Sequence, residues 1–152
     1  MPVIVIGADT EIGLASIDGL LARQGEVRAF VTDSTVGTSL KRRGVKVALG
    51  DVSDPSHVEA AALHCFSAVF VGSAAHDDRE RSFASTPKDV IDGWASAVDA
   101  AQVRRRIWVI DNATAGLVPE APGVEQAVVT SEDRPVADVA ADVVALDDAV
   151  RL

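Results

Sequence analysis

The sequence predicts a single α/β domain of three layers, with helices on both faces of a doubly wound, mostly parallel sheet of five or six strands. Short apolar runs alternate with longer amphipathic stretches, which is the pattern of successive strand–helix units. The first run, residues 3–6, is apolar without alternation, as expected of a strand buried on both faces. At 152 residues and 48% hydrophobic content, the chain can bury one sizeable core.

Each element of this fold has its own local signal. Gly25 and Gly44 are expected to end the first two helices, Pro55 and Pro87 to open the next two, and Ser131 to cap the last. The expected strands are residues 3–6, 27–31, 45–49, 68–71 and 107–110, with residues 127–129 as the sixth if there is one. The expected helices are residues 11–24, 35–43, 55–64, 87–103 and about 132–150. Residues 1–152 should form one domain, whose C-terminal part is too short for a separate substrate domain.

Composition excludes several classes of partner. A net charge of -9 and a pI near 4.6 disfavour binding to nucleic acid or an anionic membrane. The basic runs 41–43 and 104–106 are expected to be solvated helix ends, with anion binding as the less favoured alternative. The lone Cys65 fits a reducing compartment and a core position. No apolar run approaches the roughly 18 residues of a membrane span, and no secretory segment is evident, so a cytoplasmic location is expected.

The strongest local signal is the glycine-containing turn where the first strand meets the first helix. Residues 3–13 read Val-Ile-Val-Ile-Gly-Ala-Asp-Thr-Glu-Ile-Gly. Dinucleotide-binding folds use glycines at such a turn for the tight bend, for close approach of the pyrophosphate, and for packing the helix against the strand. Gly7 and Gly13 match the first and third of these roles.

This turn resembles that of the NmrA-like, atypical short-chain dehydrogenase/reductase family, which commonly reads Gly-Ala-Thr-Gly-x-x-Gly. The resemblance is good over residues 3–71, fair to residue 110 and weak afterwards, and its segment Gly-Asp-Val-Ser-Asp-Pro at residues 50–55 is similar to one that follows the family's third strand. It implies a Rossmann-like fold and an NAD(P) site in which Asp51 and Val52 lie against the adenine ring. The alternative for Asp51 is an acid that only stabilises a loop.

Several residues depart from the family pattern at the proposed binding site. Thr10 replaces the middle glycine, and a β-branched side chain there restricts the backbone and occupies space used by the pyrophosphate. Asp9 and Glu11 add negative charges that would repel a diphosphate. Thr32 stands where NADP-preferring relatives often have arginine, and Asp33 gives slight support for NAD. These changes argue against ordinary dinucleotide affinity.

The family's catalytic Tyr-x-x-x-Lys pair is absent, because the sequence has no tyrosine. Asp111, Asn112 and Thr114 follow the fifth strand and are expected at the crevice where parallel strands end. His76 follows the fourth strand and approaches the same crevice, although a loop role for it is favoured over catalysis. Asp111 and His76 are therefore the weak catalytic candidates, and no metal site is expected.

Three functions follow from these observations. The leading hypothesis is a non-catalytic or weakly dinucleotide-responsive NmrA-like module, a sensor or an association domain that binds itself or another protein. The alternatives are a small NAD(P)-dependent oxidoreductase or isomerase without the Tyr-x-x-x-Lys pair, and a purely structural interaction domain that docks through residues 132–150. The sequence is compatible with either NAD or NADP as the cofactor. The candidate cofactor-binding residues are Gly7, Thr10, Ile12, Gly13, Thr32, Asp51 and Val52.

Overall fold

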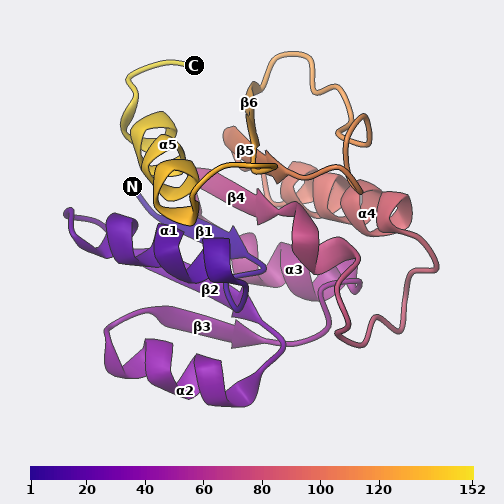
Figure 1. Ribbon diagram of the computed structural model, residues 1–152, viewed down its shortest axis with the longest axis horizontal. Helices are drawn as coiled ribbons and strands as arrows, with labels where there is room; N and C mark the ends of the chain where they lie inside the picture. The colour runs from indigo at the N-terminus through magenta and orange to yellow at the C-terminus, as the bar shows by residue number, and fades with distance from the viewer.

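The computed structural model describes residues 1–152 and confirms the predicted fold class as a six-stranded, all-parallel sheet (Figure 1). The strand order is β3-β2-β1-β4-β5-β6. Strands β2 and β3 are added on one side of β1 and strands β4 to β6 on the other, so the order switches between β1 and β4. In such sheets ligands bind at this switch point, outside the carboxyl ends of the strands. The strands are β1 (Val3–Ile6), β2 (Val27–Val31), β3 (Lys46–Leu49), β4 (Ser67–Val71), β5 (Arg105–Ile110) and β6 (Glu125–Thr130).

The helices cover both faces of the sheet, which completes the three layers (Figure 1). One face packs against α1, α2 and α5, and the other against α3 and α4. The sixth strand is longer than the predicted residues 127–129 and begins at Glu125. The helices are α1 (Glu11–Leu21), α2 (Ser34–Arg42), α3 (Pro55–Ala62), α4 (Pro87–Ala100) and α5 (Val136–Asp148), and a 3-10 turn, η1 (Gly72–Ala75), follows β4.

An aromatic stack fills the core between the sheet and α4. The rings of Phe70 and Trp108 stack with centroids 4.0 Å apart, and Trp94 also stacks with Phe70, at 5.9 Å. The indole N–H of Trp94 donates a 2.8 Å hydrogen bond to the Val52 carbonyl oxygen. This bond fixes the chain just after β3, where the resemblance places adenine-binding residues.

Two of the three arginines at residues 104–106 are not part of the solvated helix end that the sequence predicts, and only Arg104 is exposed. Arg105 and Arg106 are both 2% exposed, because β5 begins at Arg105. The Arg105 guanidinium donates to the carbonyl oxygens of Leu146, Asp147 and Ala149 at 2.7–3.0 Å, and so satisfies the open C-terminal end of α5. It also pairs with Glu125. These contacts explain why Arg105 is buried, so no bound anion is needed to explain its burial.

The last helix also begins differently from the prediction. Ser131 does not cap α5, which starts at Val136 without a side-chain cap. Instead the backbone N–H of Ser131 donates to the Ile110 carbonyl oxygen at 2.9 Å, which prolongs the pairing of β5 with β6. The serine is used by the sheet because it immediately follows β6.

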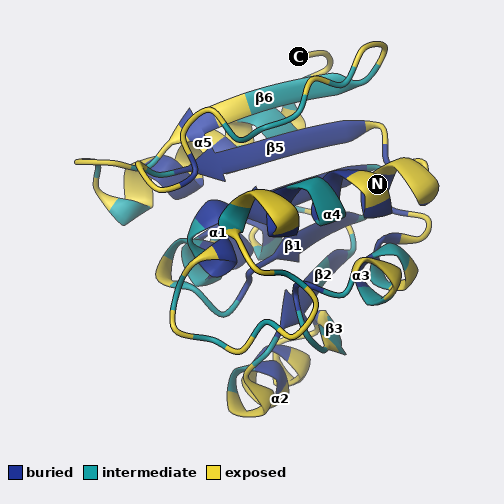
Figure 2. Cartoon of the chain, turned by 90° about the vertical axis from the view of Figure 1, so that its right-hand side faces the viewer, coloured by how far each residue is buried: buried dark blue, intermediate teal, exposed yellow.

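Burial differs sharply between the centre and the edge of the sheet (Figure 2). Strand β5 is buried along its whole length, whereas β6 is largely half-buried or exposed, with Val128 at 52% exposure. Cys65 is buried as predicted, and burial raises the pKa of its thiol to about 11. No helix is both long and apolar enough to span a bilayer.

Candidate functional site

The turn between β1 and α1 has the geometry that its two glycines predict. Gly7 adopts a φ of +81°, and a Cβ there would lie 2.8 Å from the Ala74 Cβ atom. A Cβ on Gly13 would lie only 2.3 Å from the Gly7 carbonyl oxygen. Because neither position has room for a side chain, the N-terminus of α1 packs directly against the turn.

Thr10 has a different role from the one that its replacement of glycine suggests. It is the N-cap of α1, and its hydroxyl donates to the Gly7 carbonyl oxygen at 2.7 Å while accepting from the Gly13 N–H at 3.0 Å. The hydroxyl is thus directed into the turn. The N–H groups of Glu11 and Ile12, in the first turn of α1, have no acceptor within the helix and remain suited to an anion.

Asp9 does not present an uncompensated charge to the turn, contrary to the sequence-based expectation. Its side chain is 4% exposed, and one carboxylate oxygen accepts from the N–H groups of Thr32 and Asp33 at 2.8 and 3.0 Å. The other oxygen pairs with Arg79 at 2.7 Å. The carboxylate therefore joins the end of β1 to the end of β2, and a buried guanidinium balances its charge.

A segment that follows β4 folds over the ends of β2 and β3, and we call residues 77–83 the covering segment. The Ser82 N–H donates to the Asp51 carboxylate at 2.8 Å, and the Phe83 N–H donates to the Ser53 hydroxyl at 2.9 Å. In Figure 1 this part of the chain passes close to the β3–α3 connection before it enters α4. Ser53 also hydrogen-bonds Asp51 through its N–H and its hydroxyl.

The carboxylate of Asp51 is consequently satisfied within the chain. Burial raises its pKa, but the hydrogen bonds from Ser53 and Ser82 outweigh burial and hold the pKa below its usual range. Val52, the other residue that the resemblance places at the adenine, is 1% exposed and packs in the core beside Trp94. Thr32 lies at the end of β2, with its hydroxyl 3.3 Å from an Arg79 nitrogen.

The two weak catalytic candidates from the sequence lie in contact. His76 Nε2 is 2.7 Å from Asp111 Oδ2, with the histidine side chain 30% exposed and the aspartate side chain 16% exposed. The other Asp111 oxygen accepts from the Thr114 hydroxyl at 2.8 Å and from the Thr114 N–H at 3.1 Å. Thr114 is itself fully buried, against Gly72. The carboxylate is therefore held in place, and one side of the His76 ring is held with it.

The pKa of Asp111 is set by the same contacts. Burial raises it, and the hydrogen bonds from His76 and Thr114 lower it by more, so that the pKa lies below the usual range. Asp111 is thus a carboxylate at neutral pH. At that pH it accepts the Nε2–H of His76, which leaves Nδ1 as the ring atom free to meet a ligand.

We expect Asp111 to make the stability of the protein depend on pH. A carboxyl whose pKa is lowered by folding stabilises the protein above its unfolded pKa, and that contribution is lost as the pH falls through the lower, folded pKa. In urea unfolding across acidic pH, the wild type should therefore lose stability more steeply than Asp111→Asn. Parallel curves for the two proteins would contradict the assignment.

The structure adds site residues that the sequence analysis missed. Arg79, Ser53 and Ser82 connect the covering segment to the ends of β1, β2 and β3. Thr114, which the sequence placed at the crevice, has the additional role of positioning Asp111. The available signal was the run of charges at residues 77–81, which directly follows η1. It lies where strands end, but it has no motif spacing and therefore predicts no particular contact.

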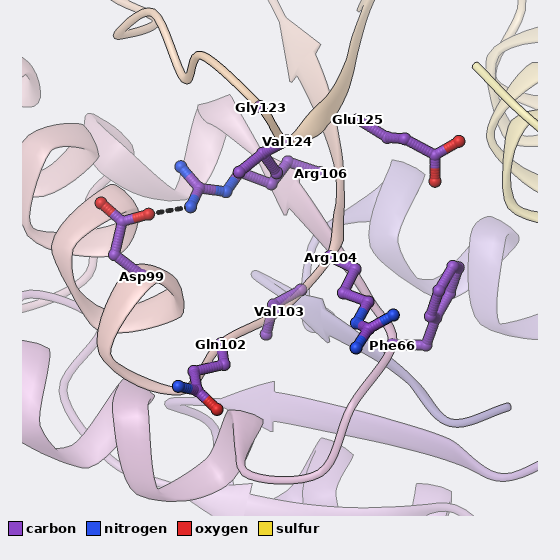
Figure 3. A pocket seen from close by; sticks show the side chains of 9 residues that line it. All are labelled: Phe66, Asp99, Gln102, Val103, Arg104, Arg106, Gly123, Val124 and Glu125. Carbon is purple, nitrogen blue, oxygen red and sulfur yellow. Dashed lines mark hydrogen bonds and ion pairs between the residues drawn. The ribbon is translucent and has the colours of Figure 1, made fainter.

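The cavity shown in Figure 3 lies at the amino ends of β4, β5 and β6, at the opposite end of the strands from the glycine turn. It has a volume of about 500 Å³, and Arg106 points across it to pair with Asp99. Glu125 points away from it and pairs with Arg105.

Nowhere in the structure do three or more His, Cys, Asp or Glu side chains converge to hold a metal ion. The glycine turn and the His76–Asp111 pair therefore form the candidate site.

The strand order, the glycine turn and the helix end that faces it define a dinucleotide-binding domain of the Rossmann-like class. The chain belongs to the NAD(P)H-binding family, whose model matches residues 7–150. This confirms the resemblance drawn from the turn. No curated protein matches the chain.

Similar solved structures confirm the fold. The anaerobillin reductase ChuY from Escherichia coli O157:H7 superposes with a TM-score of 0.72 and 19% identity, over 99% of this chain and 92% of that one. ChuY from E. coli CFT073 gives 0.64 and 21%, over 100% and 92%. Triphenylmethane reductase from Citrobacter sp., complexed with NADP(H), gives 0.62 and 16%, over 96% of this chain and 47% of that one.

Proposed function

We propose that this protein is a small NAD(P)H-dependent reductase in which His76, held by Asp111, delivers the proton that accompanies hydride transfer. The observation that carries the proposal is the 2.7 Å contact between these two side chains, at the carboxyl ends of β4 and β5. That crevice is where open parallel sheets bind their ligands. The pair supplies a proton donor in a chain that has no tyrosine.

The residues of the turn fit a dinucleotide. Gly7 and Gly13 leave the backbone without side chains where a Cβ would collide, and the free N–H groups of Glu11 and Ile12 open the N-terminus of α1 to a diphosphate. Of the two acids expected to oppose this, Asp9 is paired with Arg79, whereas Glu11 is exposed in the first turn of α1 and has no ion pair. When bound, the reduced nicotinamide supplies a hydride to an electron-poor acceptor.

His76 then acts at a defined atom. The Asp111 carboxylate accepts from Nε2 and balances the charge of the protonated ring, so the proton delivered to the acceptor comes from Nδ1. Thr114 keeps the carboxylate from rotating, because it binds the second oxygen through both its hydroxyl and its N–H. The aspartate is thus a positioning residue for the histidine, and solvent reprotonates the exposed ring between turnovers.

Structural relatives support this reading. ChuY is described as an anaerobillin reductase, and its chain is nearly spanned by this one. A protein of similar fold that this chain nearly spans is thus named as a reductase. Against triphenylmethane reductase this chain spans about half the length of that protein.

The covering segment favours a second candidate, a non-catalytic module that responds to dinucleotide. Ser82 occupies the Asp51 carboxylate, and Arg79 and Asp9 hold the segment closed over the end of β2. A dinucleotide that uses Asp51 for its adenine has to share or displace the Ser82 hydrogen bond. In this alternative, binding changes the position of the covering segment, and no acceptor is reduced.

Oxidation of NADH and NADPH by the purified protein distinguishes the two candidates. The acceptors offered should be a triphenylmethane dye and an anaerobillin, for which two of the structural relatives are named. The reductase proposal predicts acceptor-dependent loss of reduced nicotinamide. Binding of dinucleotide without acceptor-dependent oxidation would contradict it and favour the non-catalytic module.

A further inference from the structure

The Arg79 side chain donates hydrogen bonds to Asp9, Thr32 and Asp77, and nothing in its sequence context assigns it a role. Its side chain is only 10% exposed. One terminal nitrogen donates to Asp9 at 2.7 Å, while Nε and the other terminal nitrogen each donate to the Asp77 carboxylate at 2.8 Å. Burial lowers the pKa of the guanidinium, but these hydrogen bonds raise it above its ordinary value. The group is a fixed positive charge.

Asp9 is the residue that makes this charge necessary. It lies between Gly7 and Gly13, in the loop that leads into the N-terminus of α1, and its side chain is 4% exposed. Two backbone N–H groups at the end of β2 hold it there. A buried carboxylate without a counter-ion would place a negative charge beside the helix end that a diphosphate uses.

We propose that Arg79 is a positioning residue for the dinucleotide, which allows the turn to accept a diphosphate by neutralising Asp9. The inference rests on the proposed function, because it assumes that the diphosphate binds at the N-terminus of α1. Arg79 acts through Asp9 and makes no contact with the dinucleotide itself. The covering segment is therefore part of the binding site, although it follows β4 and the glycine turn follows β1.

Asp77 does not complicate this role, because it keeps a partner when Arg79 is removed. The Arg81 guanidinium donates to the same Asp77 oxygen at 3.1 Å and to the Ala74 carbonyl oxygen at 3.3 Å. Asp9 has no second cation in contact with it. Replacing Arg79 therefore leaves Asp9, but not Asp77, without a cationic partner. If Asp9 is made neutral, Arg79 should no longer be needed for dinucleotide binding.

A double-mutant cycle tests this relation by calorimetric titration with NADH and NADPH. The variants are Arg79→Met, Asp9→Asn and the double variant. The asparagine at position 9 retains an oxygen for the N–H groups of Thr32 and Asp33. Arg134→Met, which removes an exposed ion pair with Asp142, is the matched control. Thermal unfolding of each variant establishes that it is folded.

We expect Arg79→Met to weaken dinucleotide binding by roughly tenfold or more, because the charge of Asp9 then repels the diphosphate without compensation. Asp9→Asn should bind at least as tightly as the wild type, because it removes a negative charge beside the diphosphate. Arg134→Met should bind as the wild type does, and the double variant should recover most of the affinity lost in Arg79→Met. Wild-type affinity in Arg79→Met would overturn the inference alone, as would a double variant that stays as weak as Arg79→Met. Absence of binding by the wild type would overturn the proposed function as well.

Discussion

Replacing His76 with glutamine is expected to lower the turnover number of NAD(P)H oxidation by about 10²- to 10⁴-fold, the usual contribution of a positioned general acid. Glutamine keeps a hydrogen-bond donor for Asp111 but has no group that releases a proton near neutral pH. Dinucleotide affinity should change far less than turnover, because the proposed diphosphate contacts come from the N–H groups of Glu11 and Ile12 and not from His76. Steady-state kinetics together with calorimetry separates the two quantities.

A matched histidine elsewhere in the chain provides the control. His64 is exposed at the end of α3 and has a φ of +67°, a conformation that asparagine tolerates well, so His64→Asn should turn over at the wild-type rate. Asp111→Asn should fall between the wild type and His76→Gln, because it leaves the ring present but less firmly held. Turnover of His76→Gln at the wild-type rate would remove His76 from the mechanism.

Replacing Arg105 with methionine is expected to lower the free energy of unfolding by about 3 kcal/mol, the scale on which a buried charged partner is lost. The reason is the set of three α5 carbonyl oxygens that this guanidinium satisfies inside the protein. Methionine fills similar space but donates no hydrogen bond. Urea unfolding, monitored by circular dichroism, measures the difference.

The comparison variant is again Arg134→Met. Its ion pair with Asp142 is exposed on both sides, at 32% and 51%, and pairs of this kind contribute less than about 1 kcal/mol. A loss of stability in Arg105→Met no larger than that in Arg134→Met would show that the end of α5 is stabilised in another way.

The fold was predictable because burial determines sequence at the centre of a parallel sheet. Strands β1 and β4 are covered on both faces and therefore read as unbroken apolar runs. The relation between burial and sequence gave a wrong prediction at Arg105 and Arg106, because a strand that begins with two arginines has the sequence expected of a solvated helix end. Only the packing of α5 against β5 shows that Arg105 has carbonyl partners.

The candidate site was predictable where a backbone conformation demanded a residue type, and unpredictable where contacts join distant segments. Gly7 and Gly13 could be assigned from their spacing, because no other residue fits the turn. The proximity of His76 and Asp111 was predictable, because the carboxyl ends of parallel strands lie at the same end of the sheet. Arg79 was missed because it reaches Asp9 across 70 residues of sequence, and a charged loop has no period that fixes where its side chains go.

Calorimetric titration of NADH and NADPH into the wild type and into Thr10→Gly tests whether the glycine turn binds a dinucleotide. We expect saturable binding of at least one dinucleotide at a single site in both proteins. The Thr10 hydroxyl caps α1 from within the turn, so glycine should not create the site, and it costs the cap only a few tenths of a kcal/mol. Binding by Thr10→Gly alone would show that Thr10 blocks the turn, and silence from both folded proteins would contradict a functional dinucleotide site.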